Sequence, residues 1–118
     1  MRLYLCILAA ALFSVSAVCA DETANKNGER VYRSKCKSCH GAKGEGIDAK
    51  LAVKKKLDPD KLPLAPMADK SDDDVRKIII DGVEKMPGFG EKLKPEQIDD
   101  VLAFCRSLVP LNAQASGE

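Results

Sequence analysis

The chain has 118 residues, a length typical of one small domain. Its 19 Lys and Arg residues balance 18 Asp and Glu residues, which excludes a strongly basic nucleic-acid binder and a strongly acidic tail. The sequence is 31% charged and 45% hydrophobic, as in globular proteins, yet its 2 Tyr, 3 Phe and no Trp leave few aromatic side chains to fill a core.

Residues 1–20 have the layout of a cleaved secretory signal. One basic residue precedes an apolar run, and Val18 and Ala20 occupy the −3 and −1 positions of the expected cleavage site. This pattern predicts a periplasmic protein whose mature domain spans residues 21–118.

Two alternatives to cleavage remain open at this point. An uncleaved anchor is the first, because the apolar run nearly reaches the roughly 20 residues needed to span a bilayer. A lipoprotein acylated at Cys19 is the second. Cleavage leaves Cys36, Cys39 and Cys105, and an odd number excludes complete disulfide pairing within one chain.

The first half of the mature chain predicts one helix followed by irregular structure. Residues 21–27 are polar and predict a short tether, and a helix is expected from Asn27, its N-cap, to about Lys37. Three glycines in the following C-K-S-C-H-G-A-K-G-E-G segment predict a loop. Three prolines exclude one continuous helix over residues 47–70, although its start has room for a turn or two.

Two further helices have clear ends and apolar stripes. Ser71 is the expected N-cap of one helix, which Gly82 ends, and Pro95 and Pro110 bound the other. The stripe of the first is Val75, Ile78, Ile79 and Val83, and that of the second is Ile98, Val101, Leu102, Cys105, Leu108 and Val109. Because no stretch alternates as a strand does, the predicted fold class is all-α.

Cys36, Cys39 and His40 form a C-x-x-C-H sequence, the attachment signature of c-type haem. Two cysteines one helical turn apart can each form a thioether with one vinyl group of the porphyrin. The histidine that follows is then placed to ligate the iron from one side of the ring.

Three other interpretations of the same residues are less consistent with the sequence. A disulfide between Cys36 and Cys39 leaves His40 unexplained, and a thioredoxin-like redox pair belongs in a strand-containing context. A zinc site that adds Cys105 has suitable ligand types. However, adjacent Cys39 and His40 are awkward tetrahedral partners, and Cys105 belongs to an apolar helical stripe.

The chain has a single histidine, so a second axial ligand must be another residue type, and methionine is the ligand found in cytochromes c. Met86 and Met67 are the candidates. Met86 is favoured because it lies in a loop between two predicted helices, where Pro87 fixes the backbone and Gly88 and Gly90 allow close approach to a flat ring. Met67 is interpreted as an apolar gap-filler.

With these residues in place, residues 25–110 resemble the class I c-type cytochromes, of the small bacterial single-haem kind. In that family the first and last helices cross closely, and a glycine and an aromatic residue of one meet an aliphatic and an aromatic residue of the other. Gly28 and Tyr32 match the first pair, and Val101 and Phe104 match the second.

The resemblance implies an all-α cytochrome c fold, with three main helices plus loops wrapped around one covalent haem. It implies one haem c, bound through Cys36 and Cys39. It also implies that His40 and Met86 are the proximal and distal iron ligands.

The family pattern leaves two details open. A loop carbonyl near a proline supports the proximal histidine in that family, and either Pro63 or Pro66 could mark it here. Cys105 is expected to be a buried, unreactive thiol, and an intermolecular disulfide is the alternative.

The predicted function is electron transfer in the periplasm on a His/Met-ligated haem, and not enzymatic catalysis, because a filled sixth position leaves no substrate site. One alternative is a cytochrome subunit of a larger redox enzyme. The other is an open-site haem protein that binds gases or acts as a peroxidase. In the cytochrome c prime type of that class, the attachment motif lies near the C-terminus, whereas here it comes early.

Charge distribution suggests the kind of partner. Residues 30–56 contain nine basic and two acidic side chains, whereas residues 69–100 contain six basic and ten acidic ones. The attachment motif lies in the basic segment, so redox proteins with an acidic docking surface are expected. A solvated lysine-rich loop without a partner role is the alternative. No nucleic acid partner is expected. Association with a membrane is expected only if the leader or a lipid anchor is retained. The protein is expected to be a monomer.

Overall fold

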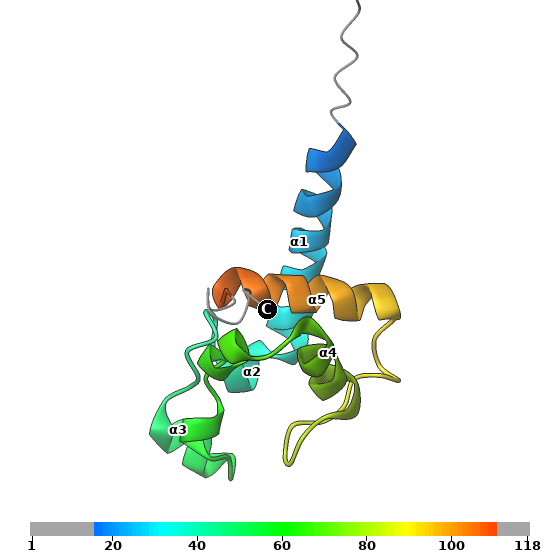
Figure 1. Ribbon diagram of the computed structural model, residues 1–118. Coiled ribbons are helices and arrows are strands. Elements are labelled where there is room, and N and C mark those ends of the chain that lie inside the picture. The colour runs from blue at the N-terminus through cyan, green and yellow to red at the C-terminus, as the bar shows by residue number, and fades with distance from the viewer. Residues whose placement is uncertain (1–15, 111–118) are drawn as a thin grey trace, which may run out of the picture.

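The computed structural model describes residues 16–110, in which helices and loops account for the fold (Figure 1). The helices are α1 (Ser16–Lys35), α2 (Lys37–His40), α3 (Ala49–Lys54), α4 (Asp72–Asp81) and α5 (Pro95–Leu108), with 3₁₀ turns η1 (Pro59–Lys61) and η2 (Ala65–Asp69). Over this range the only strand-like pairing is an isolated bridge between Val83 and Met86. The all-α prediction is therefore confirmed.

Most of the predicted leader, residues 1–15, lies outside the described residues. From Ser16 to Pro110, no helix combines the length and apolarity needed to cross a membrane.

The first helix begins well before the predicted N-cap Asn27, so the expectation of a non-helical tether over residues 21–27 was wrong. These residues are polar, but nothing in them breaks a helix before Gly28, and Lys26 Nζ lies 3.0 Å from Glu22 Oε1 one turn away. The N-terminal half of α1 projects away from the other helices (Figure 1).

The crossing of α1 over α5 organises the fold (Figure 1). At Gly28 the two backbones approach so closely that a Cβ atom would lie 2.1 Å from the carbonyl oxygen of Asp100. The rings of Tyr32 and Phe104 pack one turn further on, with centroids 5.2 Å apart. Tyr32 and Val101 are almost fully buried, so the helix pairing expected from the family resemblance is confirmed.

Helices α4 and α5 begin and end close to the predicted residues. Ser71 caps α4 by accepting a hydrogen bond from the Asp74 amide at 3.1 Å, and Gly82 ends it with a φ of 76°. Pro95 is the first residue of α5. Val83 was expected on the buried stripe of α4, but it follows the helix end and is 52% exposed.

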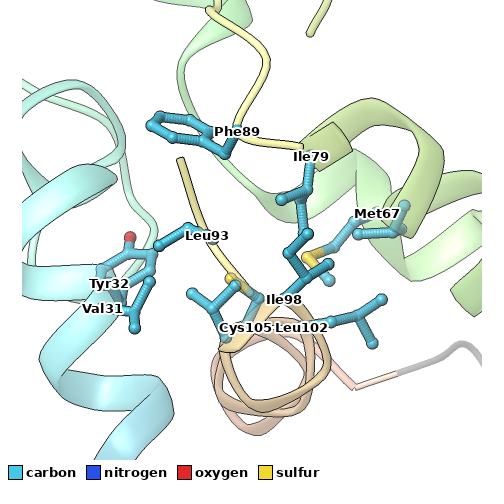
Figure 2. Packing of buried hydrophobic residues seen from close by; sticks show 11 residues of the cluster. Val31, Tyr32, Met67, Ile79, Phe89, Leu93, Ile98, Leu102 and Cys105 are labelled. Carbon is cyan, nitrogen blue, oxygen red and sulfur yellow. The ribbon is translucent and has the colours of Figure 1, made fainter. Parts of the chain in front are cut away.

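One apolar interior joins these elements, and Figure 2 shows its side chains converging from the helices and loops around it. Its members share low exposure; they are Val31, Tyr32, Met67, Val75, Ile79, Phe89, Leu93, Ile98, Val101, Leu102 and Cys105. Arg106 on α5 secures one side of this interior. It pairs with Asp72 at 2.8 Å and donates to the carbonyl oxygens of Met67 and Lys70.

Candidate haem site

The two cysteines of the C-x-x-C-H sequence lie on one turn of helix. Cys36 is the N-cap of α2, and its carbonyl accepts hydrogen bonds from the amides of Cys39 at 3.2 Å and His40 at 3.0 Å. Both thiols are free and half-buried. Burial, with a smaller contribution from the neighbouring Cys39, raises the pKa of the Cys36 thiol to about 11. The spacing suits two thioether bonds to one porphyrin edge.

The His40 ring is fixed by a single hydrogen bond to the loop ahead of α4. Its Nδ1 lies 2.6 Å from the carbonyl oxygen of Leu62, and a carbonyl can only accept, so Nδ1 carries the proton. In the neutral tautomer with the proton on Nδ1, Nε2 is the nitrogen whose lone pair can bind a metal. Leu62 directly precedes Pro63, which identifies Pro63 rather than Pro66 as the proline beside the supporting carbonyl.

The attachment turn is tied to the helix crossing through Tyr32. The Tyr32 hydroxyl donates to the carbonyl oxygen of Gly41 at 2.6 Å, directly after His40. Gly41 has a φ of 82°, a conformation that residues other than glycine rarely adopt. The turn closes where the Gly46 amide donates to the backbone carbonyl oxygen of His40 at 2.7 Å. Burial raises the pKa of Tyr32 above its ordinary value, so the hydroxyl remains a donor at physiological pH.

Met86 closes a tight turn after α4 and packs, half-buried, against the apolar interior. The amide of Met86 donates to the Val83 carbonyl at 2.9 Å, and the amide of Val83 donates back at 3.1 Å. Beyond the turn, the chain returns along the end of α4, where the Phe89 amide donates to the Ile79 carbonyl at 2.8 Å.

Gly88 and Gly90, which were expected to allow approach to a flat ring, lie against α4 itself. A Cβ atom on Gly88 would be 2.6 Å from the Ile80 carbonyl oxygen, and one on Gly90 would be 2.9 Å from the Ile80 side chain. Their small size is therefore needed for the loop to pack on the helix that precedes it.

Met67 and Met86 lie in different environments, and Cys105, the third cysteine, is buried. Met67 is 6% exposed and belongs to the interior in Figure 2, as expected of a gap-filler. Cys105 is similarly buried, and burial, followed by the nearby Cys36, raises its pKa to about 12. An unreactive thiol, as predicted, matches this environment.

Between Ser16 and Pro110 no three His, Cys, Asp or Glu side chains are arranged to hold a metal ion, which argues against the zinc interpretation. The residues fit a haem instead. Two free thiols lie one turn apart, the Nε2 of His40 is available as a ligand, and the Met86 thioether adjoins the same apolar interior.

Sequence reasoning placed the acceptor for His40 only approximately. The family resemblance implied a loop carbonyl near Pro63 or Pro66, and the residue itself stayed open because a backbone group carries no residue-type signal. The Tyr32 hydrogen bond was missed, although a Tyr at a buried crossing needs a partner for its hydroxyl, and that need is a signal.

Comparisons with known proteins agree with this description. A family profile described as "Cytochrome C oxidase, cbb3-type, subunit III" matches residues 23–104. Cytochrome c6 of Nostoc sp. is 34% identical over 92 residues, which cover 78% of this chain and 75% of that protein. Cytochrome c6 of Thermostichus vulcanus is 31% identical over 102 residues, covering 84% and 83% of the two chains. No solved structure matches at comparable significance.

Proposed function

Because the chain belongs to the class I c-type cytochromes, we propose that Cys36 and Cys39 hold its haem c and that His40 and Met86 are the axial ligands. The protein is an electron carrier rather than an enzyme. The observation that carries the ligand assignment is the hydrogen bond from His40 Nδ1 to Leu62, beside two free thiols.

The bound haem supplies an iron that alternates between ferrous and ferric states. The residues of the chain determine the reduction potential of this ferric/ferrous couple. A thioether ligand raises the potential, and the apolar interior disfavours the extra charge of the ferric state. The Leu62 carbonyl keeps the His40 ring in one tautomer and one orientation, so little rearrangement accompanies electron transfer.

The experiment that tests this proposal combines mass and redox measurements on the native protein. Intact mass should show one haem added through two thioethers, and a redox titration should show a single reversible one-electron step. Replacing Cys36 and Cys39 by serine should abolish covalent attachment. A mass without haem, or two redox steps, would overturn the assignment.

Partners with acidic docking surfaces are favoured by the region around the attachment motif. Lys55 Nζ donates to the Ser38 carbonyl at 3.0 Å, which holds the lysine-rich end of α3 beside the two cysteines. The same helix exposes Leu51 and Val53, at 42% and 67%, among its lysines. An apolar centre with a basic rim suits a partner with an apolar centre and a carboxylate rim.

Small redox reagents test the sign of this surface. Oxidation by anionic ferricyanide should slow as salt is added, and oxidation by a cationic cobalt phenanthroline complex should quicken. Changing Lys54 and Lys55 to glutamate should reverse both trends. Equal salt dependence for the two reagents would refute an electropositive docking surface.

We further propose that the leader is cleaved after Ala20 and that the mature protein acts as a monomer in the periplasm. The small residues before the expected cleavage site support this location. The N-terminal mass of the native protein measures the cleavage point and any retained lipid directly.

The second candidate is a cytochrome subunit of a larger redox enzyme, and the description of the matching family profile favours it. Both candidates use the same haem ligands, so spectra do not separate them. Gentle extraction of native membranes does, because a subunit copurifies with its enzyme whereas a free carrier does not.

A further inference from the structure

Two polar contacts join the turn that carries Met86 to other segments, and one of these segments supports His40. The Lys61 ammonium contacts both carboxylate oxygens of Glu84, at 3.0 and 2.9 Å. The Lys85 ammonium donates to the carbonyl oxygen of Lys56. We call these two contacts the loop bridge. We propose that the loop bridge holds the Met86 turn in place and so determines how readily Met86 leaves the iron, an inference that rests on the proposed role of Met86.

The bridge is attached close to both proposed ligands. Lys61 directly precedes Leu62, whose carbonyl fixes the His40 ring. Glu84 lies inside the turn that the Val83 and Met86 amides close. A displacement of Glu84 from Lys61 therefore moves the turn of one ligand relative to the support of the other.

The second contact starts in the same turn and ends on a different segment. Lys85 is the residue next to Met86, and Lys56 follows the end of α3. The turn is thus held at two adjacent positions, which restricts its rotation as well as its separation from the opposite segment.

Backbone geometry distinguishes the two acceptor residues from the other non-glycine residues that the structure describes. Among residues 16–110, the non-glycine residues with positive φ are Lys56, at 59°, and Glu84, at 51°. Side chains with a Cβ disfavour this region, and such conformations persist where surrounding contacts hold them. Both positions accept hydrogen bonds in the loop bridge, so strain and bridging coincide at the same two residues.

Exposure makes the bridge adjustable. The Lys61 and Glu84 side chains are 60% and 63% exposed, so water and salt weaken their attraction. Such a contact contributes little to the α1–α5 core, which lies elsewhere. Its influence falls on a local event, the opening of the Met86 turn.

Binding of free imidazole to the ferric protein tests the proposal, because imidazole must displace Met86 from the iron. Glu84→Gln and Lys61→Gln should each raise the association constant and rate for imidazole about two- to five-fold at low salt. The double variant should show no further increase. Exchanging the charges, with Lys61→Glu and Glu84→Lys together, should return the values toward wild type.

Salt provides the second measurement. Added salt should raise imidazole binding to the wild type toward the level of the variants and change the variants little. Glu91→Gln, which removes an exposed carboxylate beyond the Met86 turn, is the matched control and should behave as wild type. Faster hydrogen exchange at the Met86 amide in Glu84→Gln is expected and requires no added ligand.

The outcomes separate this inference from the proposed function. If Met86→Ala binds imidazole no more tightly than wild type, Met86 is not the ligand and both proposals fail. If Met86→Ala binds it more tightly but the bridge variants match wild type at low salt, only the loop bridge is refuted. Additive effects of Lys61→Gln and Glu84→Gln would also refute it.

Discussion

Gly28 of the first helix lies against the backbone carbonyl of Asp100 in the last, so close that a Cβ atom on Gly28 would lie 2.1 Å from that oxygen. The contact leaves no room for any side chain, and Gly28→Val should therefore push α1 and α5 apart. We expect a loss of about 3 kcal/mol in the free energy of unfolding, at the upper end of overpacking effects. Urea denaturation measures it, and Asn25→Val, on an exposed position of the same helix, should cost far less.

Replacing Met86 by alanine should remove the absorption band of the Met–iron bond in the ferric protein. The potential should fall by at least about 59 mV, which corresponds to a tenfold change in the one-electron equilibrium. Met67→Leu is the control, because Met67 lies in the apolar interior; its potential should be unchanged and its stability reduced by less than about 1.5 kcal/mol. A shifted potential in Met67→Leu alone would reverse the assignment.

Arg106 joins α5 to the first residue of α4 through the Asp72 carboxylate and to the segment before α4 through two carbonyl groups, and its side chain is only 12% exposed. Arg106→Met keeps much of the packing but leaves the Met67 carbonyl without this donor. We expect a loss of about 2–3 kcal/mol in urea denaturation. Asp72→Asn, which keeps the guanidinium and its carbonyl contacts, should cost about 1 kcal/mol or less. Equal losses of stability in Arg106→Met and Asp72→Asn would contradict the expectation that the carbonyl contacts of Arg106 contribute more than its ion pair.

The Cys105 thiol should resist alkylation in the folded, haem-loaded protein. With its pKa raised to about 12, roughly a thousandth of it is ionised at pH 9, against about half in the unfolded chain. Because the folded pKa is the higher one, this group stabilises the fold fully below about pH 9, and that contribution is lost as pH rises toward 12. Mass spectrometry after timed alkylation, with and without urea, measures the difference. Rapid native labelling at pH 8 would contradict it.

Without haem the chain should be poorly folded, because few aromatic side chains contribute to its interior and a bound group stabilises only the folded state. A variant with both attachment cysteines changed to serine should have reduced helicity and a broad, weakly cooperative urea transition. A sharp transition near that of the loaded protein would refute this expectation.

Local signals in the sequence were sufficient for most of the fold. Ser71 and Gly82 mark the ends of α4 because capping depends on residue type. The helix crossing at Gly28 and Phe104 was predicted from the family resemblance, and the close approach of the two backbones explains why a glycine is needed there. The start of α1 could not be placed in this way. Residues 21–27 are polar but contain no helix breaker, and a helix continues where nothing ends it.

Only the part of the candidate site that depends on residue type could be predicted from the sequence. Cys36, Cys39 and His40 are identified by their spacing, whereas the Leu62 carbonyl and the pairing of Lys61 with Glu84 depend on how distant loops come together. Such contacts between segments far apart in the sequence follow from tertiary structure, and no local pattern encodes them.

The crossing of α1 and α5 also sets the order in which this protein matures. The two helices come from opposite ends of the domain, so their contact cannot form until the last helix has been synthesised. On the export route proposed above, the chain emerges N-terminus first and exposes Cys36 and Cys39 before α5 arrives to bury their surroundings. The attachment cysteines are accessible during that interval, and folding afterwards encloses what has been attached to them.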